Sequence, residues 1–407
     1  MQKFLNWMET NFAPKMNKIN RNVWILTLKD SIMQTLPMIL VGSLVTILAI
    51  LQDFIPSMPN LWTISSYSMG LISLFISFLV PFNYMEKKKL NKMRIVAGMG
   101  GVSLFAIVVK MQETATLDFA FLGAGGMFVA IIVGVYVSII MGLFGKFSFF
   151  KEDSAIPDFV RAWFDSMLPI ALIITSGWLL VYILNFDIFV LISGMFAPIA
   201  NFAQSLPGFV LINFLCVFLY SMGISTWVLT PVTQPIFLAG ITANAAAILA
   251  GNASTNIATN EVIFSGWIAI GGIGATLPLV IMLATSKSKR LKSLGAACMI
   301  PGILNINEPV VFGCIAWNPI LMIPMWLQGI IIPIITYLVL SMGMVTIPSS
   351  VFGLWYCPFP ISTWLVSKDL RGLILLAVVV VLSCLIWYPF FKLYEKEQVA
   401  LEAAMED

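Results

Sequence analysis

The sequence contains no histidine and few charged residues. Only 10% of its 407 residues are charged, whereas about 25% are charged in globular proteins. Hydrophobic residues make up 60% of the chain, which leaves too little polar surface to cover a water-soluble protein of this size. A soluble enzyme, a disordered chain and a nucleic-acid binder are therefore disfavoured. We expect an all-α polytopic membrane protein, because a barrel would show short alternating segments instead.

The absence of histidine also excludes several kinds of chemistry. This chain cannot build a Ser-His-Asp triad, a histidine-ligated metal site or a phosphohistidine from its own residues. The cysteines are widely spaced in apolar surroundings, so we interpret them as packing residues rather than a metal-binding set. They are Cys216, Cys298, Cys314, Cys357 and Cys384. We expect no metal and no cofactor.

Charge-free apolar windows predict the membrane spans, each of which needs about 20 mostly apolar residues. N-terminal spans are expected near 30–51, 66–84, 95–110, 121–145 and 165–185, and a last one near 372–391. Basic residues cluster between spans, and positively charged loops stay in the cytoplasm, so both termini are expected there. Binding of anionic lipid or of an acidic partner is the alternative role for these clusters. Glu9 and Lys15 precede any apolar run, which is not the pattern of a cleavable signal peptide.

The C-terminal half does not divide into ordinary spans. No charge occurs from Ile188 to Asn260, and Glu308 is the only charge from Ser293 to Ser367. Prolines and glycines interrupt these windows, which indicates re-entrant hairpins and discontinuous helices around a binding site. A polar stretch at 150–160 indicates a domain boundary, and residues 188–206 are expected to tilt or to lie at the interface.

Glu308 is the leading candidate for a functional residue. An ionised carboxylate at mid-membrane costs several kcal/mol, so a chain that keeps one there has a use for it. Asn305 and Asn307 offer amide donors and acceptors before it, and Pro309 interrupts the helix after it. This set suits a ligand with several hydroxyls, such as a sugar, and the carboxylate could act as a general base toward phosphorus. The alternative is a carboxylate satisfied at a hairpin tip.

A polar run of Tyr220–Trp227, which includes Ser225, lies inside the long uncharged window and is followed by Asn244. Its side chains could contact a ligand. Its hydroxyls could equally bond back to their own helix, and both interpretations stay open.

Three further segments have competing interpretations. The run Gly271–Pro278, with Thr276, is more typical of close helix packing than of a phosphate cradle. Phe359 lies among the aromatic and proline residues of Trp355–Ser362, which could stack on a sugar ring or form an interfacial belt. Glu261 follows a Thr-Asn pair, and we expect it to begin a capped helix at the outer face.

Together these segments resemble enzyme IIC, the membrane subunit of the bacterial phosphoenolpyruvate-dependent sugar phosphotransferase system. The nearest branch is the lactose/cellobiose-type, oligo-β-glucoside group. The most specific part is Asn305–Pro309 with Phe312 and Gly313, supported by Gly271–Thr276 and Ser286–Lys292. The resemblance covers nearly the whole chain.

The resemblance implies a fold and a set of partners. The fold would have about ten transmembrane helices plus two re-entrant hairpins, and it would be that of an elevator-type sugar transporter. Residues 1–160, with the fifth span to about 187, would form the N-terminal homodimerising domain. Residues 188–407 would bind and carry the sugar. Separate IIB and IIA proteins would supply the phosphoryl group from a phosphocysteine on IIB, in the bacterial cytoplasmic membrane.

The resemblance also implies roles for individual residues. Glu308 would bond the sugar hydroxyl that receives the phosphoryl group, while Asn305 and Asn307 would shape the pocket. Ser225 stands where the family usually has histidine, and Phe359 stands where it often has tryptophan. Serine can hydrogen-bond a hydroxyl but cannot act as a cationic donor or proton acceptor near neutral pH.

Three functions follow as hypotheses. The leading one is a IIC subunit that translocates a sugar, while a separate IIB protein supplies the phosphoryl group. The second is a diverged facilitator or sensor that does not phosphorylate its sugar, which the absent histidine motivates. The third is a structural scaffold, which the density of proline-broken segments disfavours.

Overall fold

The computed structural model describes residues 10, 11, 14, 15, 18, 21–39, 41, 42, 45, 48, 59, 61–111, 118–150 and 157–406. Over these residues all regular structure is helical and no strand occurs. Seven of the described helices are long and apolar enough to cross a membrane, or up to eight if a bent pair counts as one span. The prediction of an all-α, polytopic chain is confirmed.

The described helices pack into two compact units, of which the first holds Arg21–Ile199 with Thr230–Pro235. Its helices are α3 (Val23–Met33), α5 (Trp62–Tyr67), α6 (Ile72–Lys87), α7 (Arg94–Val108), α8 (Phe119–Leu122), α9 (Met127–Leu143), α10 (Asp158–Trp178), the π-helix η7 (Leu179–Ile183) and most of α11 (Ile188–Gln204). Short 3-10 turns precede or follow them: η2 (Met69–Leu71), η3 (Asn91–Met93), η5 (Ala124–Gly126) and η6 (Phe144–Lys146).

Four of the predicted N-terminal spans fall on apolar helices of this unit. These helical stretches are Thr63–Lys87, Asn91–Val108, Ala124–Leu143 and Trp163–Ile183. The expected span near 30–51 includes residues 40, 43, 44, 46, 47 and 49–51, which lie outside the described residues.

Helix α6 is central to the first unit, since α3, α7 and α9 all pack against it. Small residues make these approaches close. A Cβ added to Gly134 on α9 would lie 2.6 Å from the Val80 Cβ on α6, and a Cβ added to Gly101 on α7 would collide with the Ser77 carbonyl oxygen. Glycine at helix contacts lets membrane helices approach one another closely.

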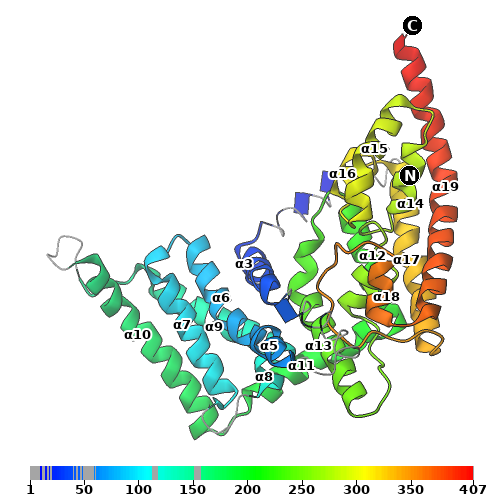
Figure 1. The fold of residues 1–407 in the computed structure, drawn as a ribbon. Helices are drawn as coiled ribbons and strands as arrows, with labels where there is room; N and C mark the ends of the chain where they lie inside the picture. The colour runs from blue at the N-terminus through cyan, green and yellow to red at the C-terminus, as the bar shows by residue number, and fades with distance from the viewer. Residues whose placement is uncertain are drawn as a thin grey trace. The chain divides into compact units, whose positions relative to one another are not determined.

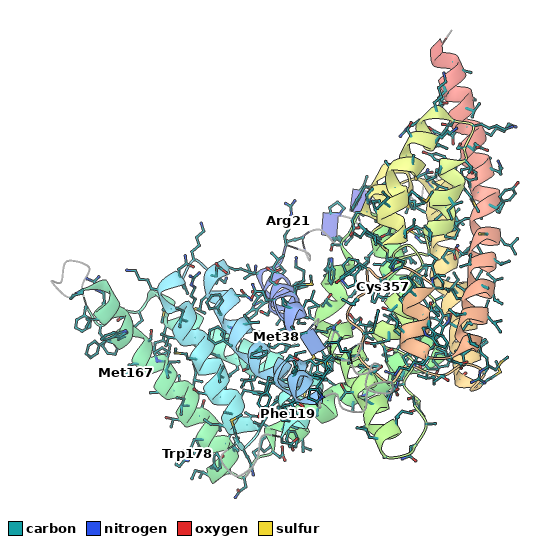
Figure 2. All side chains as sticks on the ribbon, in the orientation of Figure 1. Arg21, Met38, Phe119, Met167, Trp178 and Cys357 are labelled. Carbon is teal, nitrogen blue, oxygen red and sulfur yellow. The ribbon has the colours of Figure 1, made fainter. Side chains whose placement is uncertain are left out.

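Helix α10 presents an exposed apolar face. Trp163 is 63% exposed, and Met167 and Trp178, which lie at separate points along the helix in Figure 2, are also exposed. Lipid tails and other apolar helices are the surroundings that suit such a face.

The second unit holds Ala200–Leu229 and Ile236–Asp407, together with the described residues of Met1–Asn20. Its elements are α12 (Leu206–Ser221), η8 (Thr226–Leu229), α13 (Thr230–Leu249) from Ile236 onward, the π-helix η9 (Glu261–Gly266), α14 (Leu277–Ala284), α15 (Lys289–Ile303), α16 (Glu308–Val310), the π-helix η10 (Val311–Ile315), α17 (Pro319–Ser341), α18 (Ile361–Ser367) and α19 (Leu370–Glu406). Figure 1 shows α14, α17 and α19 together, and their packing confirms that α19 lies against both α14 and α17.

The predicted interruptions of the C-terminal half are present. Helices α14, α16 and α18 have only 8, 3 and 7 residues, and π-helical turns and loops separate them. The stretch expected to tilt, 188–206, ends in an 85° bend between α11 and α12. Ser205 lies at this bend, and its side chain accepts the Gly208 N–H at 3.3 Å as the N-cap of α12.

The basic run before α15 is held by acids on α19. The Glu402 carboxylate accepts the Ser288 hydroxyl at 2.6 Å and the N–H groups of Lys289 and Arg290 at 3.0 and 2.9 Å. Glu395 accepts the Ser286 hydroxyl and the Lys287 N–H, both at 2.8 Å. First-turn N–H groups have no partner inside their own helix, so these carboxylates stabilise the start of α15.

The close contact at Gly101 can be tested by adding one methyl group. We expect Gly101→Ala to destabilise the detergent-purified protein by about 1–3 kcal/mol, because the methyl overpacks the α6–α7 contact. Thermal unfolding measures it. Gly194→Ala on α11 is the matched control, since nothing lies within 4 Å of its added Cβ. Equal melting temperatures for the two variants would contradict the packing argument.

Candidate functional site

A loop of left-handed residues lies between η9 and α14. Gly271, Gly272 and Gly274 have φ values of +75°, +104° and +90°. A Cβ on Gly272 would also collide with the Asn307 side chain, so glycine is required there for space as well as for conformation. The run was expected to serve helix packing; it forms instead a loop that encloses an asparagine.

Helix α19 fixes the far end of this loop. The Trp387 indole donates to the Ala275 carbonyl at 3.0 Å, and the Ser383 hydroxyl donates to the same oxygen at 3.2 Å. Trp387 is fully buried in the core cluster of the unit. The loop is therefore anchored to the rigid part of the fold.

Asn305 joins two irregular segments. Its Nδ2 donates to the carbonyls of Trp355 and Cys357 at 2.9 and 3.0 Å, and its Oδ1 accepts the Gly271 N–H at 3.0 Å. Its own φ is +61°, a conformation that asparagine tolerates better than most residues. Both side-chain donors are used, so Asn305 holds the backbone around the candidate site.

Asn307 and Thr276 join the same loop from the inside. The Asn307 Nδ2 donates to the Ile273 carbonyl at 2.8 Å and to the Thr276 hydroxyl oxygen at 3.1 Å, and that hydroxyl donates to the Gly271 carbonyl at 2.6 Å. Asn307 is 4% exposed and Thr276 is fully buried. The predicted residues Asn305, Asn307 and Thr276 are thus brought together in one buried network.

Glu308 emerges from this network. It is the first residue of the short helix α16 and it is exposed, whereas the preceding Asn307 is buried. Tyr220, at the end of α12, interacts electrostatically with the Glu308 carboxylate. The Phe312 ring lies 6.0 Å from the Tyr220 ring, edge to face. The carboxylate is therefore presented on a rigid support beside aromatic groups, in reach of a ligand.

The turn that carries Ser225 adjoins the Glu308 segment. The Trp317 N–H donates to the Ser221 carbonyl at 3.1 Å, and the Trp326 indole donates to the Ser221 hydroxyl at 2.8 Å. A Cβ on Gly223 would lie 3.7 Å from a Phe312 ring carbon. Ser225 itself is exposed just beyond this turn. Two runs that lie about eighty residues apart in the sequence thus meet in the fold.

Asn244 lies elsewhere, on α13. It is fully buried, and its Nδ2 donates to the carbonyls of Asn256 and Pro348 at 2.8 and 2.9 Å. Its Oδ1 accepts the N–H groups of Thr255 and Asn256 at 3.2 and 2.9 Å. A sugar would have to displace a backbone group to bind this side chain, so its role as a substrate contact stays a prediction.

Exposed aromatic side chains flank the backbone that Asn305 holds. The Trp355 and Tyr356 rings are 41% and 42% exposed and contact each other edge to face at 5.7 Å. Cys357, labelled in Figure 2, marks the end of this short segment. Phe359, two residues farther on, is half-buried. Its contact with a sugar also stays a prediction.

The expectation for Glu261 is confirmed in one part. It begins the π-helix η9, but its carboxylate does not cap that helix, and the side chain is only 2% exposed inside the second unit. Its place at the outer face stays a prediction. Its Oε1 accepts the Phe352 N–H at 3.0 Å. The Thr259 hydroxyl, not the acid, accepts the Val262 N–H at 3.3 Å. The signal that could have found it is the one that found Glu308, a single acid in a long uncharged stretch.

Metal ligands do not gather in the part of the chain that the structure describes. No group of three or more His, Cys, Asp or Glu side chains lies together there. The chemistry of the candidate site is that of one carboxylate with amide, hydroxyl and aromatic neighbours, which suits a neutral ligand that carries hydroxyl groups.

Comparisons with known proteins agree with this chemistry. A family model described as "Phosphotransferase system, EIIC" matches residues 29–329. The chain is similar to the PTS system cellobiose-specific EIIC component of Geobacillus stearothermophilus, with 28% identity over 99% of this chain and 97% of the relative. It is also similar to the lichenan permease IIC component of Bacillus subtilis, with 27% identity over 100% of this chain and 97% of the relative.

One solved structure has the same fold. The crystal structure of the transporter ChbC, the IIC component from the N,N'-diacetylchitobiose-specific phosphotransferase system, matches with a TM-score of 0.89. The two chains are 27% identical, and the match covers 98% of this chain and 99% of ChbC. With the apolar helices described above, this match shows a multi-pass membrane protein.

The bridging role of Asn305 generates a prediction. Asn305→Ala removes partners from three backbone groups and leaves a left-handed φ on an alanine, so we expect destabilisation of about 2–4 kcal/mol. Thermal unfolding of the purified protein measures it. Asn252→Ala, at an exposed loop position, is the control. Wild-type stability of Asn305→Ala would show that these hydrogen bonds do not hold the loop.

Proposed function

The chain belongs to the phosphotransferase system EIIC family, and on that basis we propose that it is the membrane permease (IIC) subunit of a phosphoenolpyruvate-dependent sugar phosphotransferase system. The observation that carries the proposal is Glu308, exposed on the buried network of Asn305, Asn307 and Thr276. This is a single carboxylate held in a fixed place within a sequence of broken apolar helices.

The sugar is a β-glucoside or a disaccharide such as cellobiose or lactose. The relatives named for cellobiose, lichenan and N,N'-diacetylchitobiose support this class. The site has suitable chemistry, because the Glu308 carboxylate accepts hydroxyl donors while exposed rings such as Trp355 and Tyr356 offer apolar faces to a pyranose.

The proposed mechanism assigns a separate role to each residue. Glu308 accepts a hydrogen bond from the sugar hydroxyl and takes its proton as that oxygen attacks the phosphorus of the IIB phosphocysteine. The S–P bond breaks, the cysteine leaves as its thiolate, and the phosphorylated sugar is released inside. Asn305 and Asn307 keep the carboxylate in position, and Ser225 contributes a weaker polar contact than the family histidine.

The proposal includes the architecture that the family implies. About ten transmembrane helices and two re-entrant hairpins would form an elevator-type transporter. Residues 1–160 and the fifth span, to about 187, would form the homodimerising part. Residues 188–407 would carry the sugar. Both termini would be cytoplasmic in a bacterial cell membrane, where separate IIB and IIA proteins meet the chain. The exposed apolar face of α10 supports the dimer proposal.

A second function is favoured by one observation. Ser225 replaces the histidine usual in the family, so phosphotransfer has lost a candidate proton acceptor. The chain would then bind or pass free sugar as a facilitator or sensor. Uptake into vesicles that contain IIA and IIB separates the two functions, because phosphorylated sugar inside supports the permease and free sugar, unaffected by the phosphoryl donor, supports the facilitator.

Glu308 provides the decisive variant. We expect Glu308→Gln to reduce sugar phosphorylation and uptake by about 10²–10⁴-fold, because the amide cannot accept the proton. Membrane insertion and melting temperature should stay unchanged, since the side chain is exposed. Glu397→Gln is the control for the same change in charge, because Glu397 is exposed on α19. Normal uptake by Glu308→Gln would remove Glu308 from the mechanism.

Ser225 provides a gain-of-function variant. We expect Ser225→His to increase the rate of phosphotransfer or to change the range of sugars taken up, because imidazole restores a proton acceptor beside Glu308. Initial uptake rates across a panel of β-linked disaccharides measure both effects. A rate and a substrate range identical to those of the wild type would show that this position does not contact the substrate.

A further inference from the structure

Glu261 is a buried acid that the proposed mechanism does not use. It opens the π-helix η9 and is 2% exposed. Its Oε1 accepts the Phe352 N–H at 3.0 Å, the Thr259 hydroxyl also interacts with the carboxyl group, and its Oε2 has no hydrogen-bond partner among the described residues. None of the ion pairs found in the described part of the chain includes it.

Two buried hydroxyls, one on η9 and one on the helix packed against it, also lack partners. Ser265 lies one turn along η9, and Ser362 lies on α18, which packs against η9. Both are buried, 1% and 0% exposed, and neither hydroxyl has a partner among the described residues. The Thr363 hydroxyl donates to the Gly266 carbonyl at 2.7 Å and ties the two elements together. An ionised carboxylate here, without a cation, would cost several kcal/mol, whereas burying the neutral acid costs less.

The contact with Phe352 connects Glu261 to the candidate site. Phe352 belongs to the short segment Val351–Cys357, whose first two residues are buried and whose Trp355 and Tyr356 rings are exposed. Asn305 holds the other end of that segment through the carbonyls of Trp355 and Cys357. Glu261 therefore fixes this segment at Phe352, and Asn305 fixes it at Trp355 and Cys357. The exposed Trp355–Tyr356 pair lies at the part of the segment that Asn305 fixes.

We propose that Glu261, as the neutral acid, is a positioning residue for the sugar site: through the Phe352 N–H it fixes the Val351–Cys357 segment, and with it the Trp355–Tyr356 pair that lies beside Asn305. This proposal rests on the proposed function. It assigns Glu261 no contact with the sugar and no part in proton transfer to or from it.

Two substitutions test whether a neutral hydrogen-bonding side chain at position 261 is enough to hold the segment. Glu261→Gln keeps an oxygen for the Phe352 N–H and replaces the acid O–H with an amide donor. Glu261→Leu removes both. The affinity of the full-length purified protein for cellobiose, measured by calorimetry, should stay within about twofold of wild type for Glu261→Gln and fall about tenfold or more for Glu261→Leu.

Two further measurements address structure and protonation. Glu397→Gln and Glu397→Leu on α19 are matched controls, because Glu397 is exposed, and both should bind as wild type does. The infrared spectrum of the wild-type protein should contain a protonated-carboxyl C=O band that disappears in Glu261→Gln. This band keeps the proposal testable if Glu261→Leu does not fold.

The outcomes are distinguishable. A wild-type protein that binds no β-linked disaccharide would overturn the proposed function, and the positioning role with it. If the wild-type protein binds cellobiose and folded Glu261→Leu binds it with the same affinity, only the positioning role is overturned. Two results would overturn the claim that Glu261 is a neutral acid. One is a loss of affinity in Glu261→Gln as large as that in Glu261→Leu. The other is the absence of any infrared difference between the wild type and Glu261→Gln.

Discussion

Backbone groups inside a membrane must find partners within the protein, because hydrocarbon offers no hydrogen bonds. The loop Gly271–Thr276 and the segment Trp355–Cys357 are irregular backbone within a unit of apolar helices. The side-chain amides of Asn305 and Asn307 satisfy both. Without these amides the interruptions would be too costly to maintain, and Glu308 would have no fixed support.

Hydropathy correctly predicted four N-terminal spans, the last span and the interruptions between them, because the free energy of moving side chains into lipid depends on local composition. The same reasoning found Glu308, an isolated acid. Glu261 is isolated in the same way, but its local sequence predicted only the start of a helix and not its burial. Its Oε1 accepts the N–H of Phe352, which lies 91 positions away in the chain, and no local pattern reports such a contact.

The asparagines illustrate a second limit. A sequence shows which amides exist but not whether the fold already uses them. Asn244 was predicted as a substrate contact from its place in a polar run, but its amide bonds the Pro348 carbonyl, 104 positions away. Asn305 is occupied in the same way by Gly271 and Trp355. Glu308 differs because it is exposed, which follows from the fold and not from the local sequence.

The acids that hold the start of α15 have a practical consequence. Glu395 and Glu402 lie in the last turns of α19, and the helix they stabilise leads directly to Asn305. A shortened form that ends before Glu395 would lose both carboxylates and their hydrogen bonds to the start of α15. The helix that leads to Asn305 would then be held less firmly. A truncation or insertion within these turns of α19 would therefore disturb Asn305 through α15, although it lies far from that residue in the sequence.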